Sequence, residues 1–155
     1  RTLHALLPIR KIKLQGRFAG YHTDDLIVFI ENLGNDQKRK ILSQIKHSIN
    51  ITKNGKVFGE IIQAAWNDFC DPNPFRKDKD VIALITGPLN ATDINDTRTI
   101  LEWTRHPENA DEFSKRVEMT HLSSQRKRYK LQAFKTNLKN ANGGNPVSDR
   151  FFSTS

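Results

Sequence analysis

The sequence predicts an α/β fold, in which a mixed β-sheet is flanked by helices and followed by a C-terminal helical segment. Three segments suited to strands come first, then a strongly amphipathic segment and a fourth strand. The third strand, the helix and the fourth strand make a β-α-β unit, which favours parallel pairing with a right-handed crossover. The residues after 104 show only helical patterns, so the sheet belongs to the earlier part of the chain.

The first three strands are expected between residues 9 and 49. Residues 9–14, IRKIKL, alternate imperfectly between apolar and charged side chains, which suits a strand at a sheet edge. DLIVFIE, 25–31, is rich in β-branched residues and predicts the second strand. Turn-forming residues at 33–36 separate it from KRKILSQIKHSI, 38–49, so the second and third strands form a hairpin.

A helix and a fourth strand are expected next. VFGEIIQAAWNDF, 57–69, has apolar residues three or four positions apart and predicts an amphipathic helix. Pro72 and Pro74 end it, because proline has no N–H to donate and disfavours helical backbone in the preceding residue. DVIALIT, 80–86, is a continuous apolar run and predicts a strand covered on both faces.

The remaining residues are expected to be helical. The predicted helices lie at 91–103, 111–119 and 123–141. Pro107 ends the first of them, and Asn142 with the two glycines after it ends the last.

The expected domain organisation is a core at residues 1–104 and a helical extension at 105–155. The sequence begins at Arg1 rather than at a methionine and stops at Ser155 without an obvious end. We therefore expect a piece of a longer polypeptide, in which the extension leads to a further module.

The composition favours anionic partners and a reducing compartment. The net charge is +8, and residues 105–155 hold 10 basic against 5 acidic residues. A positive field favours polyanions such as nucleic acids, although many basic proteins bind none. No apolar run approaches the roughly 20 residues of a membrane span, and no secretory signal is present. Cys70 is the only cysteine, so we expect no internal disulfide, no membrane and a cytoplasmic location.

Polar side chains are expected to converge at the open end of the hairpin. Because alternate residues of a strand share a face, Gln44 and Lys46 point the same way. On the partner strand Asp24 and Asp25 point to opposite faces, so one of the two faces the third strand's polar pair in any register. Burying a lysine without a partner is costly, so a chemical reason for this placement should be sought.

A carboxylate, an amide oxygen and an ammonium are the groups of a divalent-metal site. Asp24 or Asp25, together with Gln44, offers hard oxygen ligands of the kind that Mg²⁺ or Mn²⁺ accepts, with water and a substrate phosphate completing the coordination. Lys46 would orient or help to deprotonate an attacking water and would offset charge in the transition state. The metal would activate that water and bridge it to the scissile phosphate.

The pattern of aspartate, then Gln-x-Lys, across a hairpin that a helix and a strand follow resembles the PD-(D/E)xK nuclease superfamily in its Mrr-like form, where glutamine often replaces the middle acid. In this resemblance Asp25 is the first motif acid with Asp24 as its competitor, Gln44 is the second metal ligand, and Lys46 is the catalytic lysine. The blocks TDDLIVF, QIKHS, AAWNDF, VIALITGPL and DTRTILEW are together similar to the N-terminal nuclease domain of bacterial antiphage STAND NTPases, over residues 20–145.

The resemblance implies a restriction-endonuclease-like fold and metal-dependent cleavage of double-stranded DNA. It also implies an antiviral effector that self-association of a longer parent protein switches on. Members of the superfamily usually carry a glutamate that faces the site on a helix before the first strand. Nothing before Arg1 supplies that glutamate here, so it lies outside this sequence or another residue takes its place.

Several other residues are candidates for DNA contact. The basic ones would follow the backbone without reading the sequence, His47 would contact DNA from the strand face away from the site, and Ser48 would bond a phosphate from the site face. A basic run such as RKRYK, 126–130, is also typical of a solvated helix face. The candidates are Lys11, Lys13, His47, Ser48 and Arg128.

Other interpretations stay open from the sequence alone. The two aspartates can simply begin a strand after a turn, and Lys46 can extend along a strand end with its charge in water. A catalytically silent DNA-binding module would have the same fold and would show no Mg²⁺-dependent nicking. An interaction or oligomerisation domain would associate independently of salt, unlike a protein that contacts phosphates.

Overall fold

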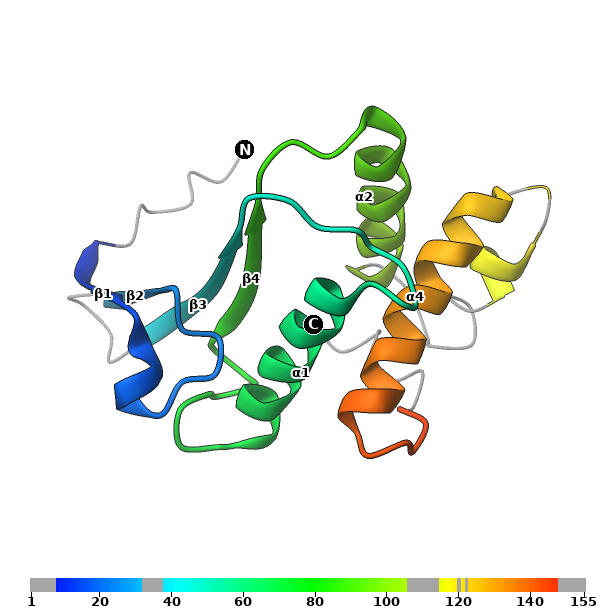
Figure 1. Cartoon of the computed structure of the whole chain (residues 1–155). Helices are drawn as coiled ribbons and strands as arrows, with labels where there is room; N and C mark the ends of the chain where they lie inside the picture. The colour runs from blue at the N-terminus through cyan, green and yellow to red at the C-terminus, as the bar shows by residue number, and fades with distance from the viewer. Residues whose placement is uncertain (1–7, 32–37, 106–114, 120, 122, 148–155) are drawn as a thin grey trace. The chain divides into compact units, whose positions relative to one another are not determined.

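The computed structural model describes residues 8–31, 38–105, 115–119, 121 and 123–147. It is a mixed α/β fold with a C-terminal helix, which confirms the fold class expected from the sequence (Figure 1). The elements are β1 (Ile9–Leu14), η1 (Gly16–Ala19), β2 (Leu26–Glu31), β3 (Lys38–Lys46), α1 (Lys56–Cys70), β4 (Val81–Thr86), α2 (Ala91–Arg105) and α4 (Gln125–Ala141).

The four strands form one sheet in the order β1-β2-β3-β4. β1, β2 and β3 pair antiparallel, and β3 pairs parallel with β4 after the chain has passed through α1. The hairpin register sets Leu26 opposite Ser43, so Asp25, one residue before β2, stands opposite Gln44. The predicted hairpin, β-α-β unit and edge position of β1 are all present.

The chain divides into two compact units, and each is described by itself. The sheet unit comprises residues 1–47 and 64–86, and the helical unit comprises residues 48–63 and 87–155. The division falls inside α1, whose first half belongs to the helical unit and whose second half belongs to the sheet unit. The domain boundary expected after residue 104 stays a prediction.

One face of the sheet is buried in its middle. Ile27 and Leu42 lie opposite each other on β2 and β3, and neither is exposed to solvent. Aromatic rings from the second half of α1 and the segment after it pack together in the same unit, with ring centroids 5.8 Å apart for Trp66 and Phe69 and 6.1 Å apart for Phe69 and Phe75. The amphipathic pattern of α1 thus supplies apolar side chains to this unit.

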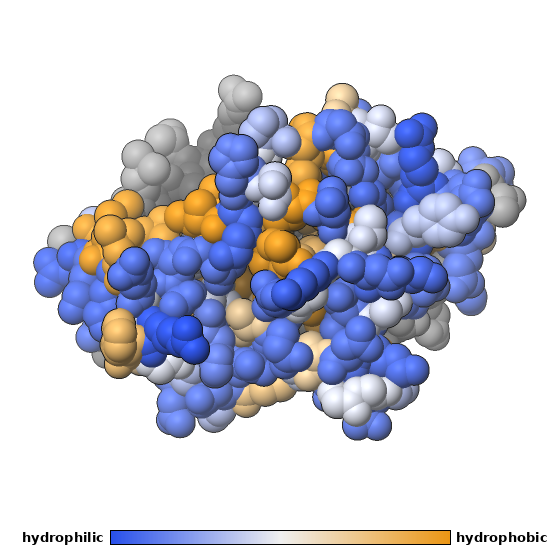
Figure 2. All heavy atoms as spheres, in the orientation of Figure 1, coloured by the Kyte–Doolittle hydropathy of each residue, from blue (hydrophilic) through white to orange (hydrophobic). Residues whose placement is uncertain are grey.

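The opposite face of the sheet differs from the expectation for the fourth strand. β4 lies at a sheet edge, and Val81 and Ile85, on one face of it, are 52% and 45% exposed. The prediction that both faces of this strand are covered is therefore wrong for the described residues. A continuous apolar run reports side-chain type, and it cannot report what packs against each face. Figure 2 shows the hydrophobic surface in orange among the blue polar residues.

Element boundaries differ from the predictions by a few residues. β3 ends at Lys46 instead of continuing to residue 49, and α1 is one residue longer at each end than the apolar pattern suggests. Of the helix predicted at 111–119, residues 115–118 are helical, and the earlier part of it lies outside the described residues together with Pro107.

The helical unit has two clusters of buried residues. Phe58 of α1 packs edge-on against Phe134 of α4, with ring centroids 5.1 Å apart. The Ser124 side chain caps α4 by accepting a hydrogen bond from Lys127 N at 3.3 Å, as serine does at helix N-termini. No helix in the described ranges is long and apolar enough to cross a membrane. The clusters are Ile49, Ile51, Phe58, Ile61 and Ala133, and Ile100, Val117 and Leu131.

Candidate active site

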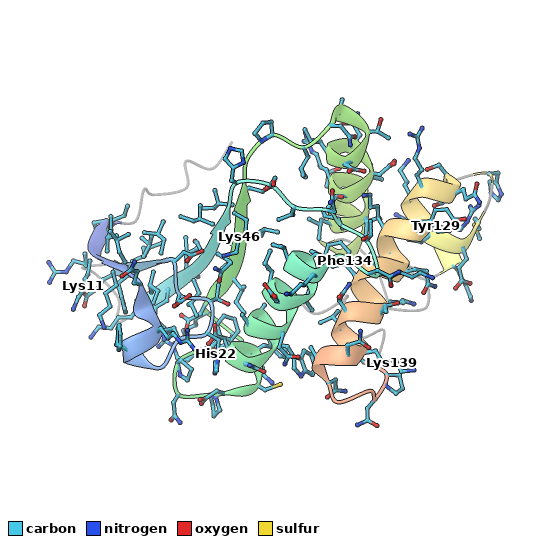
Figure 3. All side chains as sticks on the ribbon, in the orientation of Figure 1. Lys11, His22, Lys46, Tyr129, Phe134 and Lys139 are labelled. Carbon is cyan, nitrogen blue, oxygen red and sulfur yellow. The ribbon has the colours of Figure 1, made fainter. Side chains whose placement is uncertain are left out.

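The open end of the β2–β3 hairpin brings a carboxylate, an amide and an ammonium together. Asp25 Oδ2 accepts hydrogen bonds from Gln44 Nε2 at 2.5 Å and from Ile45 N at 2.7 Å. Lys46 Nζ lies 3.6 Å from the same oxygen (Figure 3 labels Lys46). The structure therefore gathers the three residues to which the sequence assigns catalytic roles.

Strand alternation and backbone hydrogen bonds produce this arrangement. Gln44 and Lys46 are two apart on β3 and share a face, as the period of a strand requires. The turn before β2 is held to the end of β1, since Gly16 N donates to Asp24 O at 2.6 Å and Gln15 N donates to Asp25 O at 3.3 Å. These bonds leave the Asp25 carboxylate directed along the hairpin end.

The three side chains differ in exposure. Gln44 is 7% exposed, whereas the side chains of Lys46 and Asp25 are 34% and 33% exposed. Water screens an ion pair of that exposure, so the pair contributes little to folding stability. The arrangement thus holds a charged pair at a surface that a phosphate can reach, beside a buried amide.

A hydroxyl lies on the neighbouring strand. Thr86 of β4 stands opposite Lys46 in the parallel register. Its Oγ1 is buried and has no hydrogen-bond partner within the described residues. A buried hydroxyl without a partner is unusual, because leaving a polar group unsatisfied costs free energy.

The donor set fits a hard divalent cation in part. Asp25 offers carboxylate oxygens and Gln44 an amide, both suited to Mg²⁺ or Mn²⁺, which retain water and substrate phosphate as further ligands. The amide nitrogen faces Asp25 in the structure, and a half-turn of the amide would present its oxygen instead. In the part of the chain that the structure describes, no three His, Cys, Asp or Glu side chains gather as a metal-binding group.

Asp24, the competing aspartate, stands on the other side of the strand direction. Its backbone oxygen accepts Gly16 N, and its residue position precedes Asp25, which stands opposite Gln44. The register therefore places Asp25, and not Asp24, across from the amide. This is the geometry expected of the first motif acid in the resemblance.

A second ionic cluster fixes the other end of β3. The buried Asp80 accepts Lys40 N and Arg76 N at 2.9 Å each, and Lys40 Nζ lies 3.4 Å from its Oδ2. Burial alone would raise the pKa of the Asp80 carboxyl, but hydrogen bonds from Arg76 and Lys40 and the charge of Lys40 outweigh it, so this pKa lies below its ordinary value. The cluster joins the starts of β3 and β4 and is structural.

The predicted DNA contacts lie in several places. Lys11 and Lys13 are on β1, opposite Phe29 and Ile27 (Figure 3 labels Lys11). Alternation through the paired strands puts both lysines on the sheet face that carries Gln44.

The other predicted contacts are not on the sheet. His47 and Ser48 follow the end of β3 and are exposed, and Ser48 already belongs to the helical unit. Arg128, also in the helical unit, donates from its guanidinium to Ser123 O at 2.7 Å, so part of its hydrogen-bonding capacity supports the start of α4.

Sequence reasoning missed one residue beside the site. Asp68 of α1 has no exposed surface, and its carboxylate accepts His22 N at 2.9 Å and Thr23 N at 2.6 Å. A signal was present, since Asp68 falls seven residues after Ile61 and therefore on the apolar face of α1. A carboxylate at such a position indicates an internal hydrogen-bonding partner.

Comparisons with known proteins do not identify the chain. No family model matches the sequence. Neither a curated protein nor a solved structure matches it either. The functional argument therefore depends on the residues and their geometry.

Proposed function

We propose that this chain is a metal-dependent endonuclease domain that cleaves double-stranded DNA, of the PD-(D/E)xK type in its Mrr-like form. The observation that carries the proposal is the meeting of Asp25, Gln44 and Lys46 at one end of the β2–β3 hairpin. Three residues spaced nineteen and two apart in the sequence have no common structural requirement to meet, whereas hydrolysis of a phosphodiester needs all three groups together.

Each residue has a role that its surroundings allow. Asp25 and Gln44 hold a Mg²⁺ or Mn²⁺ ion, which lowers the pKa of a bound water and offsets charge on the phosphate. The exposed half of the Lys46 side chain lets its ammonium reach the attacking water or a phosphate oxygen. The backbone N–H of Ile45 keeps the Asp25 carboxylate fixed from the strand side.

The surrounding charge supports a polyanionic substrate. The chain has a net charge of +8, and Lys11 and Lys13 share the sheet face of the site. Phosphate contacts of this kind supply affinity without sequence preference. In the proposed setting the domain is the cytoplasmic effector of a longer antiviral protein of the STAND type, activated when the parent protein self-associates.

A second candidate is a catalytically silent DNA-binding or oligomerisation module with the same fold. One observation favours it: no third carboxylate, histidine or cysteine in the described ranges joins Asp25 as a metal ligand. Such a module would still bind DNA through its basic surface. It would not nick DNA at any concentration of Mg²⁺ or Mn²⁺.

A cleavage assay on the activated parent protein tests the proposal. Supercoiled plasmid is incubated with the protein over a series of Mg²⁺ and Mn²⁺ concentrations, with wild type, Lys46→Ala and Asp25→Asn compared. The proposal expects metal-dependent nicking by wild type alone. Plasmid degradation by Lys46→Ala at the wild-type rate would show that the site assignment is wrong, and binding without nicking by wild type would favour the silent module.

A further inference from the structure

Asp68 is a fully buried carboxylate that the proposed chemistry does not use. It lies in the second half of α1, within the sheet unit, and has 0% exposed surface. Both of its oxygens are engaged, Oδ1 by the backbone N–H of His22 and Oδ2 by that of Thr23 (Figure 3 labels His22). Removing a carboxylate from water is costly, and two backbone donors offset that cost only while their positions are maintained.

The two bonds fix the chain directly before the proposed metal ligand. Thr23 stands two residues before Asp25, and its side chain is 1% exposed. On the other side, the end of β1 holds the same turn through Gly16 N and Gln15 N, which donate to the backbone oxygens of residues 24 and 25. The backbone from residue 22 to residue 25 is therefore held by α1 from one direction and by β1 from the other.

This clamp selects which aspartate faces the amide. Asp24 and Asp25 are adjacent, so a shift of one residue in this strand would exchange the sheet faces to which they point. Asp68 binds two consecutive backbone N–H groups with two oxygens, and a shifted chain would present different groups to it. Its contacts thus favour the register in which Asp25 stands opposite Gln44.

We propose that Asp68 is a positioning residue that locks the Asp25 carboxylate against Gln44 and thereby sets the affinity of the site for a divalent cation. The inference rests on the proposed function, because it assumes that Asp25 is a metal ligand. A residue that merely stabilises the fold would alter the free energy of unfolding. A positioning residue also alters metal affinity under conditions in which the variant is folded, as partners that orient metal ligands do.

The test compares Asp68→Asn with Asp71→Asn in the whole chain. Asparagine keeps the volume of aspartate but has one acceptor oxygen, so it turns an amide donor towards one of the two N–H groups. Asp71, at the end of the same helix, accepts Asn73 N at 2.9 Å and is a control outside the clamp. Mn²⁺ affinity is measured by calorimetry and by the spin resonance of free Mn²⁺, and folding is followed by circular dichroism.

Asp68→Asn is expected to weaken Mn²⁺ binding by about tenfold or more at a temperature where it is folded, whereas Asp71→Asn keeps the wild-type affinity. A folded Asp68→Asn that binds Mn²⁺ within about twofold of wild type overturns the positioning role. If Asp68→Asn does not fold, the same criterion is applied to Asp68→Glu, which keeps both acceptor oxygens and displaces them by one methylene.

Two further variants separate this inference from the proposed function. Asp25→Asn is expected to abolish Mn²⁺ binding, and Asp24→Asn to leave it unchanged. If wild type binds no Mn²⁺, or if Asp25→Asn binds it as well as wild type, the proposed site itself is wrong. If Asp25→Asn loses binding while Asp68→Asn retains it, the proposed site stands and the positioning role of Asp68 is refuted.

Discussion

Lys46 Nζ lies 3.6 Å from Asp25 Oδ2, at an end of the sheet where both side chains are about one third exposed. An exposed pair at this distance adds little to stability, so its stabilising effect alone does not account for the placement. A lysine held beside a carboxylate is well placed to act on a phosphate that enters from solvent. The relationship separates a functional role from a structural one, and mutations can measure each.

Lys46→Ala is predicted to reduce DNA cleavage by about a hundredfold or more, the usual effect of losing a group that handles the attacking water. The free energy of unfolding should change by less than about 1 kcal/mol, because the ion pair is solvent-screened. Plasmid nicking and urea unfolding measure the two effects. Lys38→Ala, on the same strand and 63% exposed in its side chain, is the matched control and should cleave normally.

Gln44→Glu is predicted to make folding depend on a divalent cation. It places a second carboxylate where the amide now donates to Asp25 at 2.5 Å, so without metal the variant should lose about 2 kcal/mol through lost hydrogen bonding to a charge. Mn²⁺ should raise its melting temperature more than that of wild type, since a ligand that binds the folded state stabilises it.

Gln125→Glu controls for the added charge, because Gln125 is exposed and bonds the Tyr129 hydroxyl away from the proposed site. Thermal unfolding is followed at increasing Mn²⁺ for both variants. Equal stabilisation of Gln44→Glu and Gln125→Glu by Mn²⁺ would contradict the assignment of residue 44 as a ligand.

Asp80→Asn is predicted to destabilise the protein by about 3 kcal/mol at pH 7, because it leaves buried donors and the charge of Lys40 without their partner. The pKa of the Asp80 carboxyl is lowered in the folded protein, so its stabilising contribution is present above its ordinary value of 3.8 and is lost as the pH falls through the folded pKa. The difference between the two proteins should therefore shrink as the pH falls from about 5 toward 2. Urea unfolding at several pH values measures it, and a constant difference would argue against this cause.

Lys11→Ala and Lys13→Ala are predicted to weaken binding to double-stranded DNA of any sequence. Each lost phosphate contact should reduce the slope of log affinity against log salt by about 1. Fluorescence anisotropy with two unrelated duplexes between about 50 and 200 mM salt measures this. Lys139→Ala, at the last turn of α4, is the control. Binding that ignores salt, or self-association that ignores it, would favour the oligomerisation module.

Much of the fold could be predicted because its signals are local. The alternation of β2 and β3, the apolar face of α1 and the proline residues after it all act within a few residues of sequence. The pairing of Gln44 with Lys46 followed from strand period alone. The coverage of β4 could not be predicted in the same way, because it depends on which elements pack against each face.

The choice between Asp24 and Asp25 also lay beyond the sequence. It depends on register, which the hydrogen bonds of Gln15 and Gly16 and the contacts of Asp68 fix from distant positions. A sequence pattern records that Asp68 lies on an apolar helix face, but it does not record which backbone groups meet it there. Tertiary partners of buried polar groups therefore need coordinates.

The division of the chain within α1 has a practical consequence for making fragments. The sheet unit is assembled from residues 1–47 and 64–86, so its last strand is reached only after the backbone has left for residues 48–63 and returned. No single truncation isolates it, and an expression boundary placed in the loop before α1 would remove both β4 and Asp68 from their partners. Cloning limits for a minimal version should instead enclose residues 8–86 and retain that excursion intact.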